Sequence, residues 1–227
     1  MDGGKLEMKQ VHGWWVPDYD ANMEVAINAT EFAGRKTYQL YAFAKSFPHI
    51  KNFRNAVDIG GHIGMWSYVM SRCFSTVTAF EPIATHAECF RRNLTGISNV
   101  SLCEIALGER ADEVMMATKP PVSMKARIHS VEKGLPLFPV ALWPLDAVPT
   151  PAPIDFMKID CEGYEVMVLK GAKDTICRDK PTIVVEIKPL NTVRYGFGNT
   201  DSIDLLKSWG AVVLWEYGGD ACMGWPA

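Results

Sequence analysis

The stretch Val57-Asp58-Ile59-Gly60-Gly61-His62-Ile63-Gly64 decides the fold of this chain. It predicts a buried strand that runs into a glycine-rich turn, with a helix directly behind the turn. A second apolar strand at residues 76–80 follows about twenty residues later and ends in Glu81-Pro82. Glycines let a backbone turn tightly and approach a ligand, and a carboxylate at the tip of the next strand can hold a ribose diol. The pattern therefore predicts a nucleotide cradle.

The spacing of these glycines separates two classes of nucleotide ligand. A dinucleotide fingerprint reads G-x-G-x-x-G, and its middle glycine lets a pyrophosphate sit at the helix N-terminus. Here the spacing is Gly60-x-x-x-Gly64, and Asp58 lies two residues ahead of the first glycine. An acid beside the turn would repel a pyrophosphate, but it suits S-adenosylmethionine, which carries an amino group and a sulfonium and no phosphate. Asp58 could also tie down the turn through backbone N–H groups.

Further segments, in the same order along the chain, make it resemble the FkbM family of S-adenosylmethionine-dependent methyltransferases. The K-I-D-x-E-G segment that begins at Lys158 separates this family from other methyltransferases. Gly61-His62 stands where relatives usually carry Ala-Asn or a similar pair, so His62 is expected to act through its backbone. The matching stretches cover roughly residues 55–190: Val57–Gly64, Ala79–Pro82, Ala106–Gly108, Lys158–Glu165, Lys170–Ala172 and Pro181–Glu186.

The resemblance implies a Rossmann-like class I methyltransferase fold, which is an α/β fold with a mostly parallel, doubly wound sheet and a short antiparallel C-terminal strand. The residues agree with that expectation. Near-continuous apolar runs at residues 154–160 and 182–187 are typical of parallel strands covered on both faces. At the C-terminus, residues 222–225 could pair back across the Gly218-Gly219-Asp220 turn, in a very short strand.

The domain division follows from the position of the nucleotide motif. Residues 55–227 are expected to form the methyltransferase domain, and residues 1–54 an N-terminal extension that lids the cofactor, contacts the substrate or only packs. Residues 109–150 are less regular and rich in proline, with short candidate strands at 114–116 and 138–141. Because apolar residues continue throughout, this stretch indicates an insertion near the site rather than disorder.

The composition is that of a globular enzyme domain. Hydrophobic residues make up 48% and charged residues 22%, and the net charge of −3 gives no global basic field for nucleic acid or anionic lipid. No apolar run approaches the length of a membrane span, and the first residues do not resemble a signal peptide. The six cysteines are scattered without a C-x-x-C motif, so we expect reduced thiols and a cytoplasmic location.

Acidic residues are expected to gather at the strand ends, where open parallel sheets bind ligands. Glu81 is predicted to bind ribose, Glu104 to contact the adenine side or to be a solvated loop acid, and Glu186 to act in the site or to pair with Lys188. The predicted cofactor contacts are Asp58, Gly60, Gly61, His62, Ile63, Gly64, Glu81, Pro82, Glu104, Ala106 and Asp160.

Methyl transfer to an alcohol requires help with deprotonation, because the hydroxyl is mostly protonated at neutral pH. Asp160 is the first choice of base, ahead of Glu162 and Glu186, and its alternative role is to cap the following helix. Together the three acids could instead hold a hard cation such as Mg²⁺. His129, in the insertion, is a further candidate base or substrate contact.

The acceptor is expected to be a neutral or weakly charged hydroxyl compound, since the resembled family modifies sugars, lipid-linked glycans and natural products. Aromatic residues of the extension and insertion could face it: Trp14, Trp15, Tyr38, Phe138 and Trp143.

Two other functions remain open at this point. One is RNA ribose 2′-O-methylation, whose lysine–acid–lysine–acid set could use Asp160 and Glu186, with lysines drawn from Lys36, Lys45, Lys170 or Lys173. The other is a non-catalytic domain that binds the cofactor as a structural or regulatory ligand.

Overall fold

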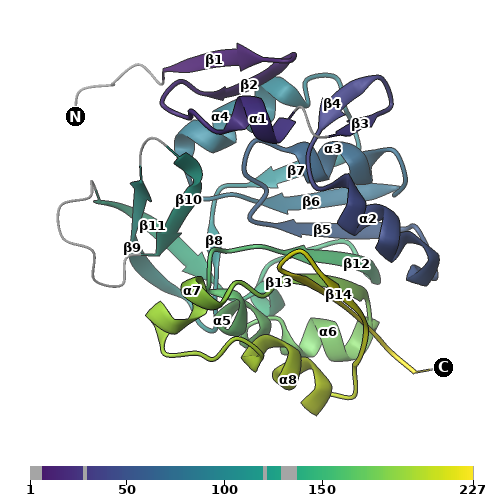
Figure 1. Ribbon diagram of the computed structural model, residues 1–227. Helices are drawn as coiled ribbons and strands as arrows, with labels where there is room; N and C mark the ends of the chain where they lie inside the picture. Colours follow the sequence, from purple (N-terminus) through teal and green to yellow (C-terminus); the bar gives the residue numbers. More distant parts are fainter. Residues whose placement is uncertain (1–6, 28–29, 120–121, 129–136, 227) are drawn as a thin grey trace.

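The glycine turn lies at the centre of a seven-stranded sheet, in the order β14-β15-β13-β12-β5-β6-β7 (Figure 1). The computed structural model describes residues 7–27, 30–119, 122–128 and 137–226. Five neighbouring strands run parallel: β5 (Asn55–Ile59), β6 (Thr76–Phe80), β7 (Val100–Cys103), β12 (Ile154–Ile159) and β13 (Thr182–Glu186). The chain builds outward from β5 to one side and then returns to build from β12 to the other. The carboxyl ends of β5 and β12 therefore form the switch point at which such sheets bind ligands.

Two C-terminal strands complete the sheet. β14 (Val212–Tyr217) lies at the edge, and β15 (Asp220–Gly224) runs antiparallel between β13 and β14. The predicted mostly parallel sheet with a short antiparallel C-terminal strand is confirmed. The strand starts two residues earlier than residues 222–225, and its register places Asp220 opposite Glu186.

Helices cover both faces of the sheet, as in a doubly wound fold (Figure 1). On one face, α2 (Leu40–Ser46), α3 (Met65–Ser71) and α4 (Ala84–Asn93) share a core cluster with β5, β6 and β12. On the other face, α5 (Glu165–Lys170), α6 (Lys173–Asp179) and α8 (Asp201–Ser208) share a second cluster with the same sheet. Short helical segments join these elements: η1 (Phe47–His49), η2 (Leu145–Ala147), α7 (Pro189–Thr192) and η3 (Val193–Tyr195).

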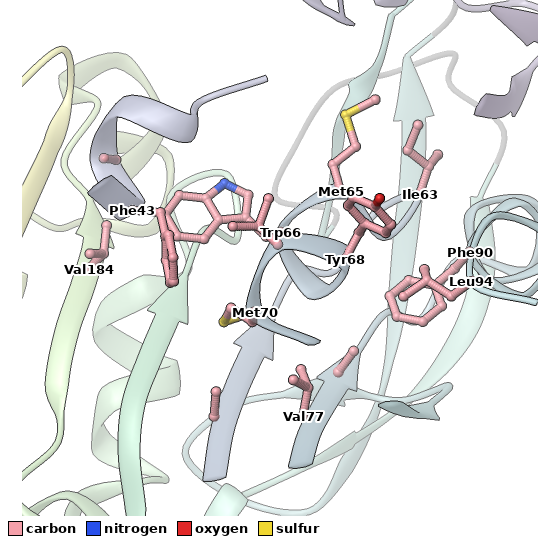
Figure 2. Close-up of a cluster of buried hydrophobic side chains, with 14 of the residues drawn as sticks. Phe43, Ile63, Met65, Trp66, Tyr68, Met70, Val77, Phe90, Leu94 and Val184 are labelled. Atoms are coloured by element: carbon pink, nitrogen blue, oxygen red, sulfur yellow. The ribbon is translucent and has the colours of Figure 1, made fainter. Parts of the chain in front are cut away.

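The N-terminal extension is part of the first core cluster. It consists of β1 (Met8–Val11), β2 (Trp14–Pro17), α1 (Met23–Ile27), β3 (Thr30–Phe32), β4 (Arg35–Thr37) and α2. Figure 2 shows Phe43 of α2 beside Trp66 of α3, and the Phe43 ring lies 5.7 Å from that of Phe156 on the sheet. Trp14 is fully buried in the same cluster. The extension therefore has no core separate from that of residues 55–227.

The insertion forms a sheet of its own. β8 (Ala106–Leu107), β9 (Asp112–Lys119), β10 (Val122–Ile128) and β11 (Leu137–Trp143) are paired in the order β10-β9-β11-β8. These strands are longer than the short segments at 114–116 and 138–141 that the sequence indicates, because β9 pairs with neighbours on both sides. His129 lies outside the described residues.

In the described part of the chain, no helix combines the length and apolarity needed to cross a bilayer. The six cysteines are all free.

Candidate active site

A cavity of about 510 Å³ opens at the carboxyl ends of β5, β6 and β12, at the switch point of the sheet. It brings together residues that are far apart in the sequence. Of the predicted site residues, those that line it are Gly60, Gly61, His62, Glu81, Pro82, Ala106, Asp160 and Glu162. The cavity therefore joins the nucleotide cradle to the acids proposed for chemistry.

The glycine turn packs closely against neighbouring parts of the chain as well as facing the cavity. Gly60 has a φ of +79°, and a Cβ there would lie 2.0 Å from the backbone oxygen of Asp160. Gly64 has a φ of +92°, and a Cβ there would lie 2.2 Å from the side chain of Leu94, the residue that follows α4. The two glycines thus let the end of β12 and the side chains of α4 approach the turn. Gly64 and the fully buried Ile63 do not line the cavity and support the cradle from behind.

Asp58 also lies behind the turn. Its side chain is fully buried, Oδ2 accepts a hydrogen bond from Ser67 Oγ at 2.7 Å, and Oδ1 lies 3.8 Å from Lys158 Nζ. Burial raises the pKa of Asp58, and Lys158 opposes that shift. Asp58 does not line the cavity, and it contacts the side chains of Ser67 and Lys158. It braces the turn against α3 and β12.

Glu81 lies at the cavity wall with both oxygens held. Oε2 accepts a hydrogen bond from the His62 N–H and Oε1 from the Ile83 N–H, both at 2.9 Å. His86 Nδ1 lies 3.3 Å from Oε1. Burial opposes ionisation, but His86 and the backbone donor together lower the pKa of Glu81 below its ordinary value. An ionised, oriented acceptor results, and His62 supports it through its backbone.

The prediction for Glu104 needs correction. Its carboxylate pairs with Arg91 at the surface and does not line the cavity. The backbone that follows it turns inward, so Ile105, Ala106 and Leu107 form the wall instead. The strand-end position alone does not decide the role: Glu104 follows β7 directly, as Glu81 follows β6, but its side chain turns to Arg91 at the surface.

Lys158 joins the cradle to the acids. Its Nζ donates a hydrogen bond to the Gly60 carbonyl at 3.0 Å and lies 3.5 Å from Asp160 Oδ2. On the next strand, Glu186 contacts the ammonium group of Lys188. Asp160, Glu162 and Glu186 can bring one oxygen each within 4.8 Å of one another. The cluster therefore consists of three acids that lie close together, and two lysines contact them.

The pKa values of the two central acids are shifted in opposite directions. Burial alone would keep Asp160 neutral, but Lys158 and Lys188 lower its pKa below the ordinary value. Burial raises the pKa of Glu186, and the neighbouring Asp160 and Glu162 raise it further. Lys158 stays charged despite its burial, because Asp160 and Asp58 raise its pKa. The two shifts run in opposite directions, so Asp160 loses its proton more readily than Glu186 does.

Comparison with known proteins identifies this architecture. A family model described as the methyltransferase FkbM domain matches residues 58–213. The chain belongs to the FkbM methyltransferase family. A curated relative, Methyltransferase 1 of Beauveria bassiana, is 27% identical over 157 residues, which are 58% of this chain and 63% of that protein. The chain therefore spans less than two thirds of the length of this relative.

Solved structures share the fold. An FkbM methyltransferase from Methylobacillus flagellatus superposes with a TM-score of 0.51 at 20% identity, over 77% of this chain and 44% of that one. A putative O-methyltransferase from Klebsiella pneumoniae gives a TM-score of 0.51 at 14% identity, over 90% and 85% of the two chains. S-adenosylmethionine is the cofactor of this family, and the cavity beside the glycine turn offers in Glu81 a carboxylate that can accept hydrogen bonds from ribose hydroxyls.

The site of this FkbM methyltransferase includes residues that the sequence did not single out. Asn191 of α7 donates a hydrogen bond to Glu162 Oε2 at 2.9 Å. Burial raises the pKa of Asp220 on β15 to about 6, and the nearby carboxylate of Asp160 contributes to that rise. Lys158 lies two residues before Asp160, a spacing that shares one face of a strand and that predicts the contact between them.

Three carboxylates can converge in the site, and they could ligate a hard divalent cation. The same carboxylates already have cationic partners, since Lys158 faces Asp160 and Lys188 contacts Glu186. A metal ion would have to compete with two ammonium groups.

The extension and the insertion each reach the cavity, but not through most of the predicted aromatics. Asn22, Tyr38 and Gln39 of the extension line it, as does Met116 of the insertion. The other candidates lie elsewhere: Trp14 in the core, Trp15 under Arg92, Phe138 against the core of the insertion and Trp143 at the surface.

Proposed function

We propose that this chain transfers the methyl group of S-adenosylmethionine to a hydroxyl of a sugar, a glycan or a natural-product-like small molecule. The sulfonium is already an activated electrophile, so alignment supplies much of the rate. The hydroxyl needs a base, and the observation that carries the proposal is the position of Asp160 on the cavity wall beside Lys158, where Lys158 and Lys188 lower the pKa of its carboxyl. Glu186, whose pKa is raised by burial and by its acidic neighbours, can donate a hydrogen bond that holds Asp160 in place.

The chemistry of the cavity supports a neutral acceptor. Among the described residues, its lining carries three acids (Glu81, Asp160, Glu162) and three basic side chains (Lys158, Lys188, Arg194), apart from two histidines. These charges balance, so no strong field selects an anionic acceptor. Tyr38, Tyr164 and Leu190 add apolar faces of the kind on which sugar C–H groups pack.

A screen of candidate hydroxyl acceptors with isotopically labelled methyl donor, read by mass spectrometry, tests this function. The expected product is a methyl ether on a neutral acceptor. Methylation only at nitrogen or carbon would contradict the proposal. Cofactor binding without product from any acceptor class would favour a non-catalytic domain.

Replacing Glu81 by alanine should weaken binding of S-adenosylmethionine by about tenfold to a hundredfold, because a charged acceptor of the ribose hydroxyls is lost. Isothermal titration of both proteins measures the change. Glu88→Ala, at a partly exposed position of α4, is the matched control and should bind as wild type. Wild-type affinity of the Glu81 variant would contradict the ribose assignment.

Turnover should survive removal of divalent cations, because Lys158 and Lys188 supply the positive charge that a metal would bring to the acids. Activity is measured after dialysis against EDTA and again after addition of Mg²⁺. Loss of activity in EDTA with full recovery in Mg²⁺ would instead make Asp160, Glu162 and Glu186 metal ligands.

One observation favours the RNA ribose reaction as a second candidate. Lys158, Asp160, Lys188 and Glu186 form a lysine–acid–lysine–acid set in space. The lysines suggested from sequence, Lys36, Lys45, Lys170 and Lys173, do not line the cavity. The net charge of −3 argues against an RNA groove, so strongly salt-dependent RNA binding would be needed to favour this reaction.

A further inference from the structure

His86 stands directly behind the carboxylate that we assign to ribose. Its side chain is 1% exposed, and Nδ1 lies 3.3 Å from Glu81 Oε1. The ring packs edge-on against that of His62 at 4.5 Å, so it cannot turn away without opening the cavity wall. With Nδ1–H donated to Glu81, Nε2 is left as an acceptor.

That acceptor faces the N-terminal extension. The Tyr19 hydroxyl lies 3.5 Å from His86 Nε2. Burial raises the pKa of Tyr19 to about 12, so the hydroxyl keeps its proton and can donate it. The next residue, Asp20, accepts hydrogen bonds from the N–H groups of Asn22 and Met23 at the start of α1. Asn22 lines the cavity, so one short stretch of the extension touches both His86 and the ligand space.

A second contact fixes the same part of the extension to α4. Asn93, one end of α4, accepts a hydrogen bond from the Trp15 N–H at 2.6 Å and donates to the Trp15 carbonyl at 2.8 Å. Its amide also donates to the carbonyl of Ile63 in the glycine turn at 2.9 Å. α4 therefore carries two links between the extension and the cradle, through Asn93 and through His86.

We propose that His86 is a positioning residue that orients Glu81 toward the ribose diol and ties this orientation to the docked Tyr19 segment of the extension. The inference rests on the proposed role of Glu81. A carboxylate offers about four lone-pair directions, and His62, Ile83 and His86 occupy three of them. The remaining direction on Oε2 is free for a ribose hydroxyl. His86 thus limits which rotamer of Glu81 meets the ligand.

A pair of cofactor analogues separates this role from a purely structural one. S-adenosylhomocysteine and its 2′,3′-dideoxy analogue are titrated calorimetrically into wild type, His86→Leu, His86→Asn and Tyr19→Phe. His86→Leu should lose about tenfold in affinity for S-adenosylhomocysteine and almost nothing for the dideoxy analogue, which has no diol to orient. Tyr19→Phe should show a smaller loss with the same selectivity.

His86→Asn retains an amide donor near the position of Nδ1 and should recover most of the affinity. If the leucine variant does not fold, Tyr19→Phe carries the test with its own diol-selective loss. His49→Leu, an exposed histidine at the opposite end of the sheet, is the matched control. Equal losses for the two analogues in His86→Leu or in Tyr19→Phe, or no loss of affinity in both of these variants, would overturn the inference. Failure of the ribose assignment itself would be recognised separately, by wild-type affinity of Glu81→Ala.

Discussion

The variant Asp160→Asn should lower turnover by about 10²- to 10⁴-fold and leave the affinity for S-adenosylmethionine within a few-fold of wild type. The asparagine keeps the shape of the side chain but cannot take a proton from the acceptor hydroxyl. Asp160 is suited to that task because Lys158 and Lys188 keep it ionised at the cavity wall. The measurement is steady-state turnover with the acceptor found by the labelled-methyl screen, alongside cofactor titration.

Glu186→Gln provides the sharpest comparison. Burial and two neighbouring acids raise the pKa of Glu186, which favours its protonated form, so a neutral glutamine amide can replace its donor function toward Asp160. This variant should therefore retain far more activity than Asp160→Asn. Asp174→Asn, exposed on α6, controls for the loss of one negative charge. Near wild-type turnover in Asp160→Asn, with a collapse in Glu186→Gln, would reverse the two roles.

Much of the fold follows from local sequence patterns. The strand and turn at Val57–Gly64 predict β5 and its helix, and the unbroken apolar run at 182–187 predicts a strand covered on both sides. These elements are encoded by a few adjacent residues. The candidate strands at 114–116 and 138–141 lie within β9 and β11, but the full length of these strands could not be predicted, because it depends on their pairing with each other across the insertion.

Site residues could be predicted from the sequence where they lie within a recognisable motif or directly after a predicted strand. Glu81 and Asp160 could be found from strand-end positions, and the pairing of Glu186 with Lys188 was among the sequence expectations and is confirmed. Asp220 could not be found, because only the register set by the Gly218-Gly219 turn brings it opposite Glu186.

The N-terminal aromatics show a different limit of sequence patterns. Trp14 and Tyr38 are both large rings in a short irregular segment, and composition does not say which one faces a cavity. Tyr38 does, because Gln39 is fixed by a hydrogen bond from Trp66 Nε1, whereas Trp14 lies under the Arg35 guanidinium in the core. Such tertiary contacts decide between a packing role and a ligand role.

The second large effect is expected on stability. Lys158→Met should lower the free energy of unfolding by about 3–5 kcal/mol, because removing one partner leaves buried charge uncompensated. Lys158 is 5% exposed, and it is the cation nearest to both Asp58 and Asp160 among the described ion pairs. It also donates to the Gly60 carbonyl, so the turn loses a hydrogen bond. Denaturant unfolding of both proteins measures the difference, and Lys173→Met on the surface of α6 is the control.

The cause can be separated from simple loss of packing by pH and by a second substitution. The pKa of Asp58 is already raised in the folded protein, mainly by burial, and loss of Lys158 should raise it further. A carboxyl with a raised folded-state pKa favours folding when protonated and opposes it once the pH exceeds that pKa. The difference in the free energy of unfolding between wild type and Lys158→Met should therefore shrink as the pH is lowered. Adding Asp58→Asn should recover part of the lost stability at neutral pH, because the uncompensated charge is gone. A deficit that is independent of pH and additive in the double variant would mean that Lys158 acts through packing and not through charge.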